Sequence, residues 1–357
     1  MQSFYNHTYL KTIMYKHFLR PILFLLSPES IHHLIVFGLK IFRWVPGFTA
    51  LLRALFTVRH PSLEREVFGL KFSNPIGLAA GFDKNAECYN EIAAFGFGAI
   101  ETGTVTPKGQ PGNAKPRCFR LPKDRALINR MGFNNRGADA MLKCLKKKKR
   151  RAVIGVNLGK NTATPNEQAP AEYLSSFRKL YDYADYFVIN VSCPNIKNLC
   201  GLQDKDNLEK IIGGLTEFRR GQSVYRPILM KISPDLTDSQ IDDTIDVLRT
   251  SGIDGIVATN TTTSREGLKT DAKTVEAIAN GGLSGGPLTA RAIEVVRYVH
   301  RKTEGNFPII GVGGIMSVDD AVAMLDAGAS LIQLYTGFIY NGPGFAKQIC
   351  KRLIKTA

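Results

Sequence analysis

Small and polar residues follow short apolar runs at eight places in the chain, which is where enzymes built on parallel strands keep their reactive groups. Taken singly, each of these residues could be an ordinary hydrogen-bonded loop residue. That interpretation weakens because all eight places carry amide, hydroxyl, ammonium, thiol or glycine groups. They include Lys84, Thr104, Asn157, Asn190, Cys193, Lys231, Thr259, Gly313 and Thr336. Their recurrence predicts one ligand-binding site assembled from several segments.

Two lysines in this set suggest different roles. Lys84 follows a Gly-Phe-Asp turn and offers a cation to an acidic ligand. Lys231 lies inside the apolar run 228–232, and a buried ammonium must be paired or neutralised. It could form a Schiff base with a carbonyl substrate, or act as a cation that holds an electron-rich cofactor ring. The spacing leaves both alternatives open.

Cys193 occupies a Ser-Cys-Pro-Asn turn just after an apolar run. It could be a plain buried cysteine, because free cysteine packs as a small apolar residue. A thiolate acting as a base is the alternative, since cysteine titrates near ~8.5 and its pKa can be lowered. A Cys–His nucleophile is disfavoured, because five of the six histidines lie at or before His60 and the last is His300.

Glycines gather after the seventh run, as Gly311-Val312-Gly313-Gly314, and Thr336-Gly337 follows the eighth. Backbone N–H groups exposed by glycine bind phosphate, and barrels of alternating strands and helices place a phosphate cradle after their last two strands. We therefore predict a phosphate-bearing ligand.

The elements that must position these residues are short apolar strands alternating with helical stretches after residue 70. Near-continuous apolar strands separated by helices are typical of a buried parallel sheet. Eight such units predict an α/β fold, a (β/α)8 TIM barrel over residues 61–357, with a doubly wound open sheet as the alternative. The runs are 76–80, 99–103, 153–158, 186–191, 228–232, 255–259, 309–312 and 331–335.

Residues 1–60 form a separate segment, helical in pattern from about residue 12 to residue 60. Apolar residues recur at spacings of three to five; Pro28 breaks the pattern, and Pro46-Gly47 ends the second helical unit. The segment holds seven Lys or Arg and one acid, Glu29. These features suit an amphipathic hairpin on an anionic membrane surface, with a helical cap on the main domain as the alternative. No apolar run reaches the roughly 18 residues of a membrane span.

The net charge of +16 favours an anionic partner. We expect no nucleic acid, because the charge is spread along the chain and no nucleic-acid-binding motif accompanies it. None of the six cysteines forms a CxxC pair and no HExxH is present. We therefore expect no metal and a reducing, cytoplasmic setting.

Six long motifs carry a family resemblance: 74–84 (NPIGLAAGFDK), 102–107 (TGTVTP), 128–135 (INRMGFNN), 258–262 (ATNTT), 281–285 (GGLSG) and 309–315 (IIGVGGI). With them the chain, from about residue 67 to 353, resembles the dihydroorotate dehydrogenases of the second, quinone-linked class. The helical extension before residue 60 resembles the membrane-associating segment of that class more loosely.

The resemblance implies FMN as the cofactor. Lys231 would then face the flavin ring, so the Schiff-base alternative falls away. The residues implied to contact FMN are Ala80, Gly81, Thr104, Asn157, Asn190, Lys231, Thr259, Gly285, Gly313, Gly314, Tyr335 and Thr336.

The resemblance also implies that a base removes the C5 proton of dihydroorotate and that the C6 hydride passes to flavin N5, which gives orotate. The implied base is Cys193, although the quinone-linked class usually carries serine there and the soluble class cysteine. The residues implied to hold the substrate are Lys84, Asn129, Arg130, Met131, Gly132, Phe133, Asn134, Asn190, Asn195, Asn260 and Thr261.

A membrane quinone is implied to enter through a tunnel lined by His32, Arg120 and Tyr335. We expect a peripheral protein on the cytoplasmic face of the bacterial inner membrane, with no required protein partner. Three alternatives compete: the soluble class of the same family, a lyase or isomerase barrel binding a phosphorylated substrate, and a non-catalytic membrane-binding module.

Overall fold

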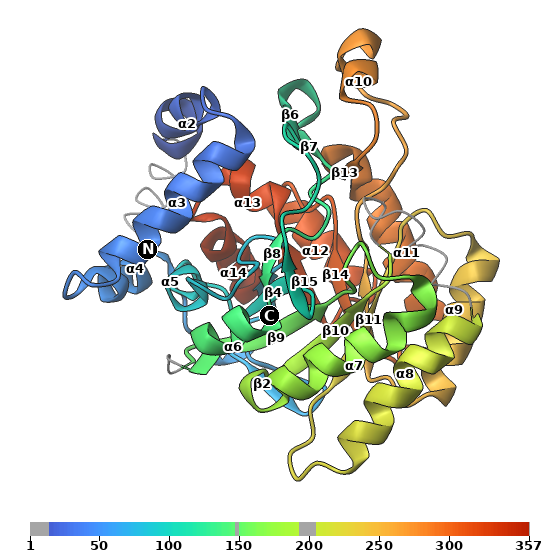
Figure 1. The fold of residues 1–357 in the computed structure, drawn as a ribbon. Helices are drawn as coiled ribbons and strands as arrows, with labels where there is room; N and C mark the ends of the chain where they lie inside the picture. Colours follow the sequence, from blue (N-terminus) through green and yellow to red (C-terminus); the bar gives the residue numbers. More distant parts are fainter. Residues whose placement is uncertain (1–13, 147–149, 193–204, 357) are drawn as a thin grey trace.

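A closed barrel of eight parallel strands forms the body of the protein in the computed structural model, which describes residues 14–146, 150–192 and 205–356 (Figure 1). Each predicted apolar run coincides with all or most of one barrel strand, so the predicted TIM barrel is confirmed. The parallel pairing of Ile332 with Ile76 closes the ring and excludes the open sheet. In ring order the strands are β3 (Ile76–Leu78), β4 (Ala99–Val105), β9 (Val153–Leu158), β10 (Tyr186–Asn190), β11 (Ile228–Ile232), β12 (Gly255–Ala258), β14 (Ile309–Val312) and β15 (Leu331–Leu334).

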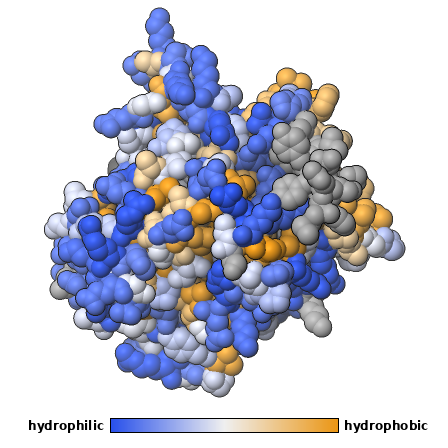
Figure 2. All heavy atoms as spheres, turned by 180° about the vertical axis from the view of Figure 1, so that it is seen from behind, coloured by the Kyte–Doolittle hydropathy of each residue, from blue (hydrophilic) through white to orange (hydrophobic). Residues whose placement is uncertain are grey.

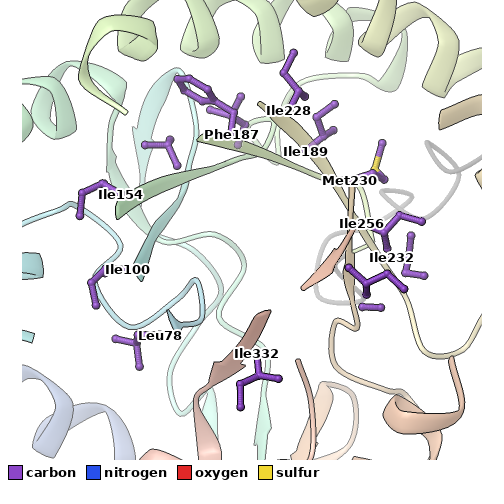
Figure 3. Packing of buried hydrophobic residues seen from close by; sticks show 14 of the residues in the cluster. Leu78, Ile100, Ile154, Phe187, Ile189, Ile228, Met230, Ile232, Ile256 and Ile332 are labelled. Atoms are coloured by element: carbon purple, nitrogen blue, oxygen red, sulfur yellow. The ribbon is translucent and has the colours of Figure 1, made fainter. Parts of the chain in front are cut away.

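Successive residues of each strand face opposite sides of the barrel wall, which separates two apolar cores. Val188 and Leu229 pack inside the barrel. Their neighbours Phe187 and Ile228 pack outside it, in the layer between strands and helices (Figure 3). The surrounding helices are α5 (Tyr89–Ala93), α6 (Ala138–Lys146), α7 (Ala169–Leu180), α8 (Lys205–Arg220), α9 (Asp238–Thr250), α11 (Thr289–Lys302), α12 (Val318–Asp326), α13 (Thr336–Asn341) and α14 (Phe345–Thr356).

Four helical elements occupy the described residues before residue 60: η1 (Tyr15–Leu19), α2 (Arg20–Phe24), α3 (Pro28–Phe42) and α4 (Phe48–Phe56). Pro28 interrupts the pattern as predicted, and it also begins α3, because the Ser27 hydroxyl caps that helix by accepting from Ser30 N at 3.2 Å. The second predicted helical unit ends at Pro46-Gly47, and α3 stops shortly before that point, at Phe42. The structure continues with α4, because Gly47 takes a φ of 81° and turns the chain into a new helix.

Apolar side chains cover the outer side of these helices, at the upper right of Figure 2. Leu25 is 85% exposed and Trp44 is 78% exposed. Within the described residues no single helix is long and apolar enough to cross a membrane. The bent pair Tyr15–Phe24 and Pro28–Phe42, at 112°, meets that test of length and composition only when the two are taken together.

Polar side chains fasten the N-terminal helices to the barrel domain. Glu29 of α3 accepts from Arg117 at 2.7 Å, and Lys40 of α3 donates to Glu87 at 2.7 Å. The Tyr15 hydroxyl donates to the carbonyl of Ile339 at 2.7 Å. These contacts hold α3 beside the C-terminal ends of the strands.

A small antiparallel sheet rises above the barrel and was not predicted. It pairs β6 (Cys118–Leu121) with β7 (Ala126–Asn129) and β7 with β13 (Gly282–Gly285) (Figure 1). β6 and β7 form a local hairpin, whereas β13 pairs with β7 from more than 150 residues away, so this second pairing cannot be read from local pattern. The sheet brings Asn129 and Gly285 to the mouth of the barrel.

Candidate active site

A cavity of about 760 Å³ lies where the C-terminal ends of the barrel strands meet the N-terminal helices. The predicted site residues divide into those that line it and a few that do not. Cys193 and Asn195 lie outside the described residues. The lining members are His32, Ala80, Gly81, Lys84, Thr104, Arg120, Asn129, Met131, Gly132, Phe133, Asn134, Asn190, Lys231, Thr259, Asn260, Thr261, Gly285, Gly313, Gly314, Tyr335 and Thr336.

Glycines at the end of β13 and just after β14 line part of the cavity. Gly285, Gly313 and Gly314 have φ values of 101°, 121° and 68°, which other residues rarely adopt. A Cβ at Gly314 would overlap the backbone of Thr289, and one at Gly285 would lie 2.9 Å from Cγ2 of Thr336. These positions therefore have no room for a side chain, and Gly313 and Gly314 lie where the sequence predicted a phosphate cradle.

Three amide side chains form a directed chain of hydrogen bonds at the cavity floor. Asn260 Nδ2 donates to Asn190 Oδ1 at 3.3 Å, and Asn190 Nδ2 donates to Asn157 Oδ1 at 3.1 Å. Thr104 Oγ1 also donates to Asn157 Oδ1, at 2.5 Å. Asn157 does not itself line the cavity, so it lies one hydrogen bond behind Thr104 and Asn190.

Two lysines supply positive charge to the cavity. The Lys84 ammonium donates to Asn134 Oδ1, which places two of the predicted substrate residues together. Lys231 is 6% exposed, and in the strand register it lies between Asn190 of β10 and Val257 of β12. Cations in a cavity with many apolar lining residues favour an anionic ligand, because low-dielectric walls screen their charge poorly.

His32 of α3 lies where the polar strand ends meet the apolar helices. Its ring is edge-on to Phe82 with centroids 4.9 Å apart, and Phe82 is edge-on to Tyr335 at 5.9 Å. Burial, helped by the charge of Lys84, lowers the pKa of His32 to about 4. The imidazole is therefore neutral at pH 7 and can donate one hydrogen bond and accept another.

Arg120 of β6 lies at the same end of the cavity. Its guanidinium stands over the ring of Phe24 at 4.4 Å and donates to the carbonyl of Leu26 at 2.6 Å. Its Nε is buried without a hydrogen-bond partner among the residues described here. Burial raises the pKa of the neighbouring Cys118 thiol to about 11, so it stays protonated. This end of the cavity thus offers one unused N–H donor in apolar surroundings.

Arg130 is the predicted substrate residue whose side chain the structure turns away. Its guanidinium donates to the carbonyls of Ile278 and Pro116, the latter at 3.2 Å, and stands over Phe119 at 4.8 Å. Extended backbone alternates its side chains, and Asn129 faces the cavity, so Arg130 faces the other way. Its guanidinium is committed to other contacts.

Glu101 and Gln333 were not predicted as site residues. Glu101 is fully buried in β4 and accepts from Asn157 Nδ2 at 2.8 Å and Gln333 Nε2 at 2.7 Å. A charged residue inside an apolar run, the feature that drew attention to Lys231, also marks Glu101. In the parts of the chain that the structure describes, no group of three or more His, Cys, Asp or Glu could hold a metal ion.

Comparisons with known proteins agree on one family. The family model described as dihydroorotate dehydrogenase matches residues 62–356. A protein of Christiangramia forsetii named dihydroorotate dehydrogenase (quinone) is 53% identical over 342 residues, which cover 96% of this chain and 99% of that protein. A protein of the same name from a Synechococcus species is 46% identical over 352 residues, covering 95% of this chain and 92% of that protein.

Solved structures are similar over nearly the same length. The crystal structure of DHODH from Eimeria tenella in complex with ferulenol has a TM-score of 0.83 and 36% sequence identity, covering 92% of this chain and 91% of that chain. The ligand-free form from the same organism has the same TM-score and identity and covers 92% of this chain and 94% of that chain.

Proposed function

The chain belongs to the dihydroorotate dehydrogenase family, and from this premise we propose that it oxidises dihydroorotate to orotate, with FMN as cofactor and a membrane quinone as electron acceptor. One observation carries the proposal. A single cavity changes from glycines and amides at the strand ends to apolar side chains of the N-terminal helices. Such a cavity suits a phosphate-bearing redox cofactor placed between a polar substrate and an apolar acceptor.

The residues at the strand ends fit FMN. Gly285, Gly313, Gly314 and Thr336 would hold its phosphate through backbone N–H groups and a hydroxyl. Gly81 leaves room for a flat ring beside Tyr335, since a Cβ at Gly81 would already lie 3.4 Å from Cε2 of that tyrosine. When bound, FMN accepts a hydride, and the Lys231 ammonium would favour its reduced, anionic form. The remaining proposed contacts are Ala80, Thr104, Asn157, Asn190 and Thr259.

The substrate would lie near Lys84, whose ammonium pairs with a carboxylate. Dihydroorotate also carries amide groups, and asparagine offers a donor and an acceptor to each of them. The hydrogen bond between Lys84 and Asn134 supports this placement, because both would reach one ligand. The further residues proposed to hold the substrate are Asn129, Met131, Gly132, Phe133, Asn190, Asn195, Asn260 and Thr261.

We assign the removal of the C5 proton to Cys193. A C193S variant should lose much activity, and the activity that remains should have a more alkaline optimum, because serine has the higher intrinsic pKa. The measurement is the pH profile of flavin bleaching by dihydroorotate. An unchanged rate and profile would remove Cys193 from this role.

His32, Arg120 and Tyr335 would line the route of the quinone. The unused Nε of Arg120 supports this, because a quinone carbonyl needs a donor in apolar surroundings. We place residues 1–60 as the quinone-associating segment and 61–357 as the catalytic domain, which agrees with a family match that begins at residue 62.

The N-terminal helices would rest on the cytoplasmic face of the bacterial inner membrane, with their exposed apolar side chains in the lipid interface. Trp44 tests this directly, because it is the only tryptophan in the chain and is 78% exposed. Vesicles containing anionic lipid should shift its emission to shorter wavelength. Emission that does not respond to such vesicles would contradict the membrane assignment.

An anaerobic absorbance titration separates the proposal from its rivals. Dihydroorotate should bleach a bound flavin, and a ubiquinone or menaquinone analogue should restore the colour. A flavin whose colour returns only with fumarate or NAD would place the protein in the soluble class. The cysteine at position 193 favours that alternative, because the soluble class usually carries cysteine there. A colourless purified protein would point to a lyase or isomerase barrel.

A further inference from the structure

Glu101 is a buried carboxylate to which the proposed reaction gives no role. It is fully buried inside the barrel and accepts two hydrogen bonds, from Asn157 Nδ2 and Gln333 Nε2. Gln333 and the amide chain above Asn157 both reach the cavity, whereas Glu101 does not. Glu101 therefore supports the cavity wall from behind in two places, through Gln333 and through Asn157.

The amide chain has a direction, and it ends on Glu101. Asn260 donates to Asn190, Asn190 donates to Asn157, and Asn157 donates to Glu101. An ionised carboxylate can only accept, so it compels Asn157 to turn its Nδ2 inward and its Oδ1 toward Asn190. Asn190 and Asn260 are oriented in the same way, because each amide donates from Nδ2 to the Oδ1 of the next one.

Glu101 also contributes charge. Two amide donors at 2.7 and 2.8 Å are the partners that a carboxylate uses when it is ionised. Lys231, the cation proposed to face the flavin, is adjacent in the register to Asn190, the middle member of the chain. Glu101 is linked to this lysine through Asn157 and Asn190, and in the poorly screened barrel interior its negative charge opposes the effect of the lysine on the flavin ring.

We propose that Glu101 is a positioning residue for the reaction. It sets the donor–acceptor direction of Asn157, Asn190 and Asn260, and its charge holds the reduction potential of the flavin below the value that Lys231 alone would give. This inference rests on the proposed flavin enzymology. It concerns a residue behind the site, not one that touches the ligands.

Two substitutions of Glu101 separate its effect on the orientation of the amide side chains from the effect of its negative charge. Glu101→Gln removes the charge but keeps an oxygen for Asn157, because Gln333 has a buried Oε1 without a partner among the described atoms and can turn around. Glu101→Leu removes both charge and acceptor. Glu91→Gln is the matched control, because Glu91 is a buried carboxylate on α5 that does not line the cavity.

The purified variants would be compared by flavin content, orotate affinity measured from the flavin spectrum, and midpoint potential against a reference dye. E101Q should raise the potential by about 30 mV or more, which is a tenfold change in the two-electron equilibrium, with orotate affinity within about threefold. E101L should also weaken orotate binding about tenfold or more. E91Q should match the wild type in all three measurements.

An unchanged potential in E101Q would overturn the charge argument, and unchanged orotate affinity in E101L would overturn the direction argument. If E101L does not fold, the potential of E101Q decides the inference. A wild-type protein without flavin would instead refute the proposed function, so the two failures are distinguishable.

Discussion

His32 gives the docking of the N-terminal helices a predictable dependence on pH. Its ring is buried between α3 and Phe82, and its pKa is lowered from 6.5 to about 4, mainly by burial. When α3 detaches, the imidazole is solvated and titrates at its ordinary pKa. The detached state therefore binds a proton in the range between pH 6.5 and 4, whereas the docked state does not.

The sign and size of the effect follow from this difference. Docking is fully favourable above pH 6.5 and weakens as the pH falls toward 4, because the detached state alone gains the proton. Each pH unit in this range changes the free energy of docking by about 1.4 kcal/mol. Between pH 7 and pH 5 the docking free energy should fall by about 2 kcal/mol, or roughly 20-fold in the opening equilibrium.

Hydrogen exchange of the amides in α3 (Pro28–Phe42), corrected for the intrinsic effect of pH, measures this opening. Glu29 also has a lowered pKa, through its hydrogen bond and ion pair with Arg117 set against burial, but it loses its contribution only as the pH falls below its ordinary value of 4.5. Measurements that stop at pH 5 therefore report mainly His32. H32Q should abolish the slope.

H33Q is the matched control, because the side chain of His33 is adjacent and 62% exposed. It should keep the wild-type slope. A wild-type slope that persists in H32Q, or a wild-type protein whose α3 protection does not change between pH 7 and pH 5, would refute the reasoning.

Three further predictions concern the cavity. In G314A the affinity for FMN should fall about tenfold or more, because Gly314 has a φ of 68° and a side chain there would overlap the backbone of Thr289. Flavin absorbance of the purified protein measures this loss. G38A is the control and should keep its flavin, because nothing lies within 4 Å of a Cβ at Gly38. K231M should slow flavin bleaching by dihydroorotate about 100-fold in anaerobic stopped flow, because one preorganised charge is lost; an unchanged rate would contradict its role. R120M should raise the KM for a quinone analogue about tenfold without changing the rate of flavin bleaching, and a slower bleaching step would show that Arg120 acts on the other half-reaction.

The sequence alone determined the barrel and much of its site. Each barrel strand is a short apolar run bounded by helical pattern, because both faces of the strand are buried, one in the barrel interior and one beneath helices. Residues at the C-terminal ends of such strands must meet around one axis. Lys84, Lys231 and Gly314 could therefore be assigned to a common cavity from their positions along the chain.

Tertiary structure decided what depends on contacts between distant segments. Distant segments meet in the pairing of β7 with β13, in the anchoring of Glu29 by Arg117 and in the burial of His32 against Phe82, and their separation in the chain hides these contacts. Arg130 turns away from the cavity because its neighbour Asn129, at the end of β7, faces the cavity and successive side chains of an extended segment alternate.

The role of Glu101 shows the same division most clearly. The sequence places a carboxylate in an apolar run, but it does not say which donors satisfy it. Only the closed barrel brings Asn157 from β9 and Gln333 from β15 to its two oxygens. A local pattern fixes which side of a strand a residue faces, whereas the partner on that side is fixed by strand order and register, which are properties of the whole chain.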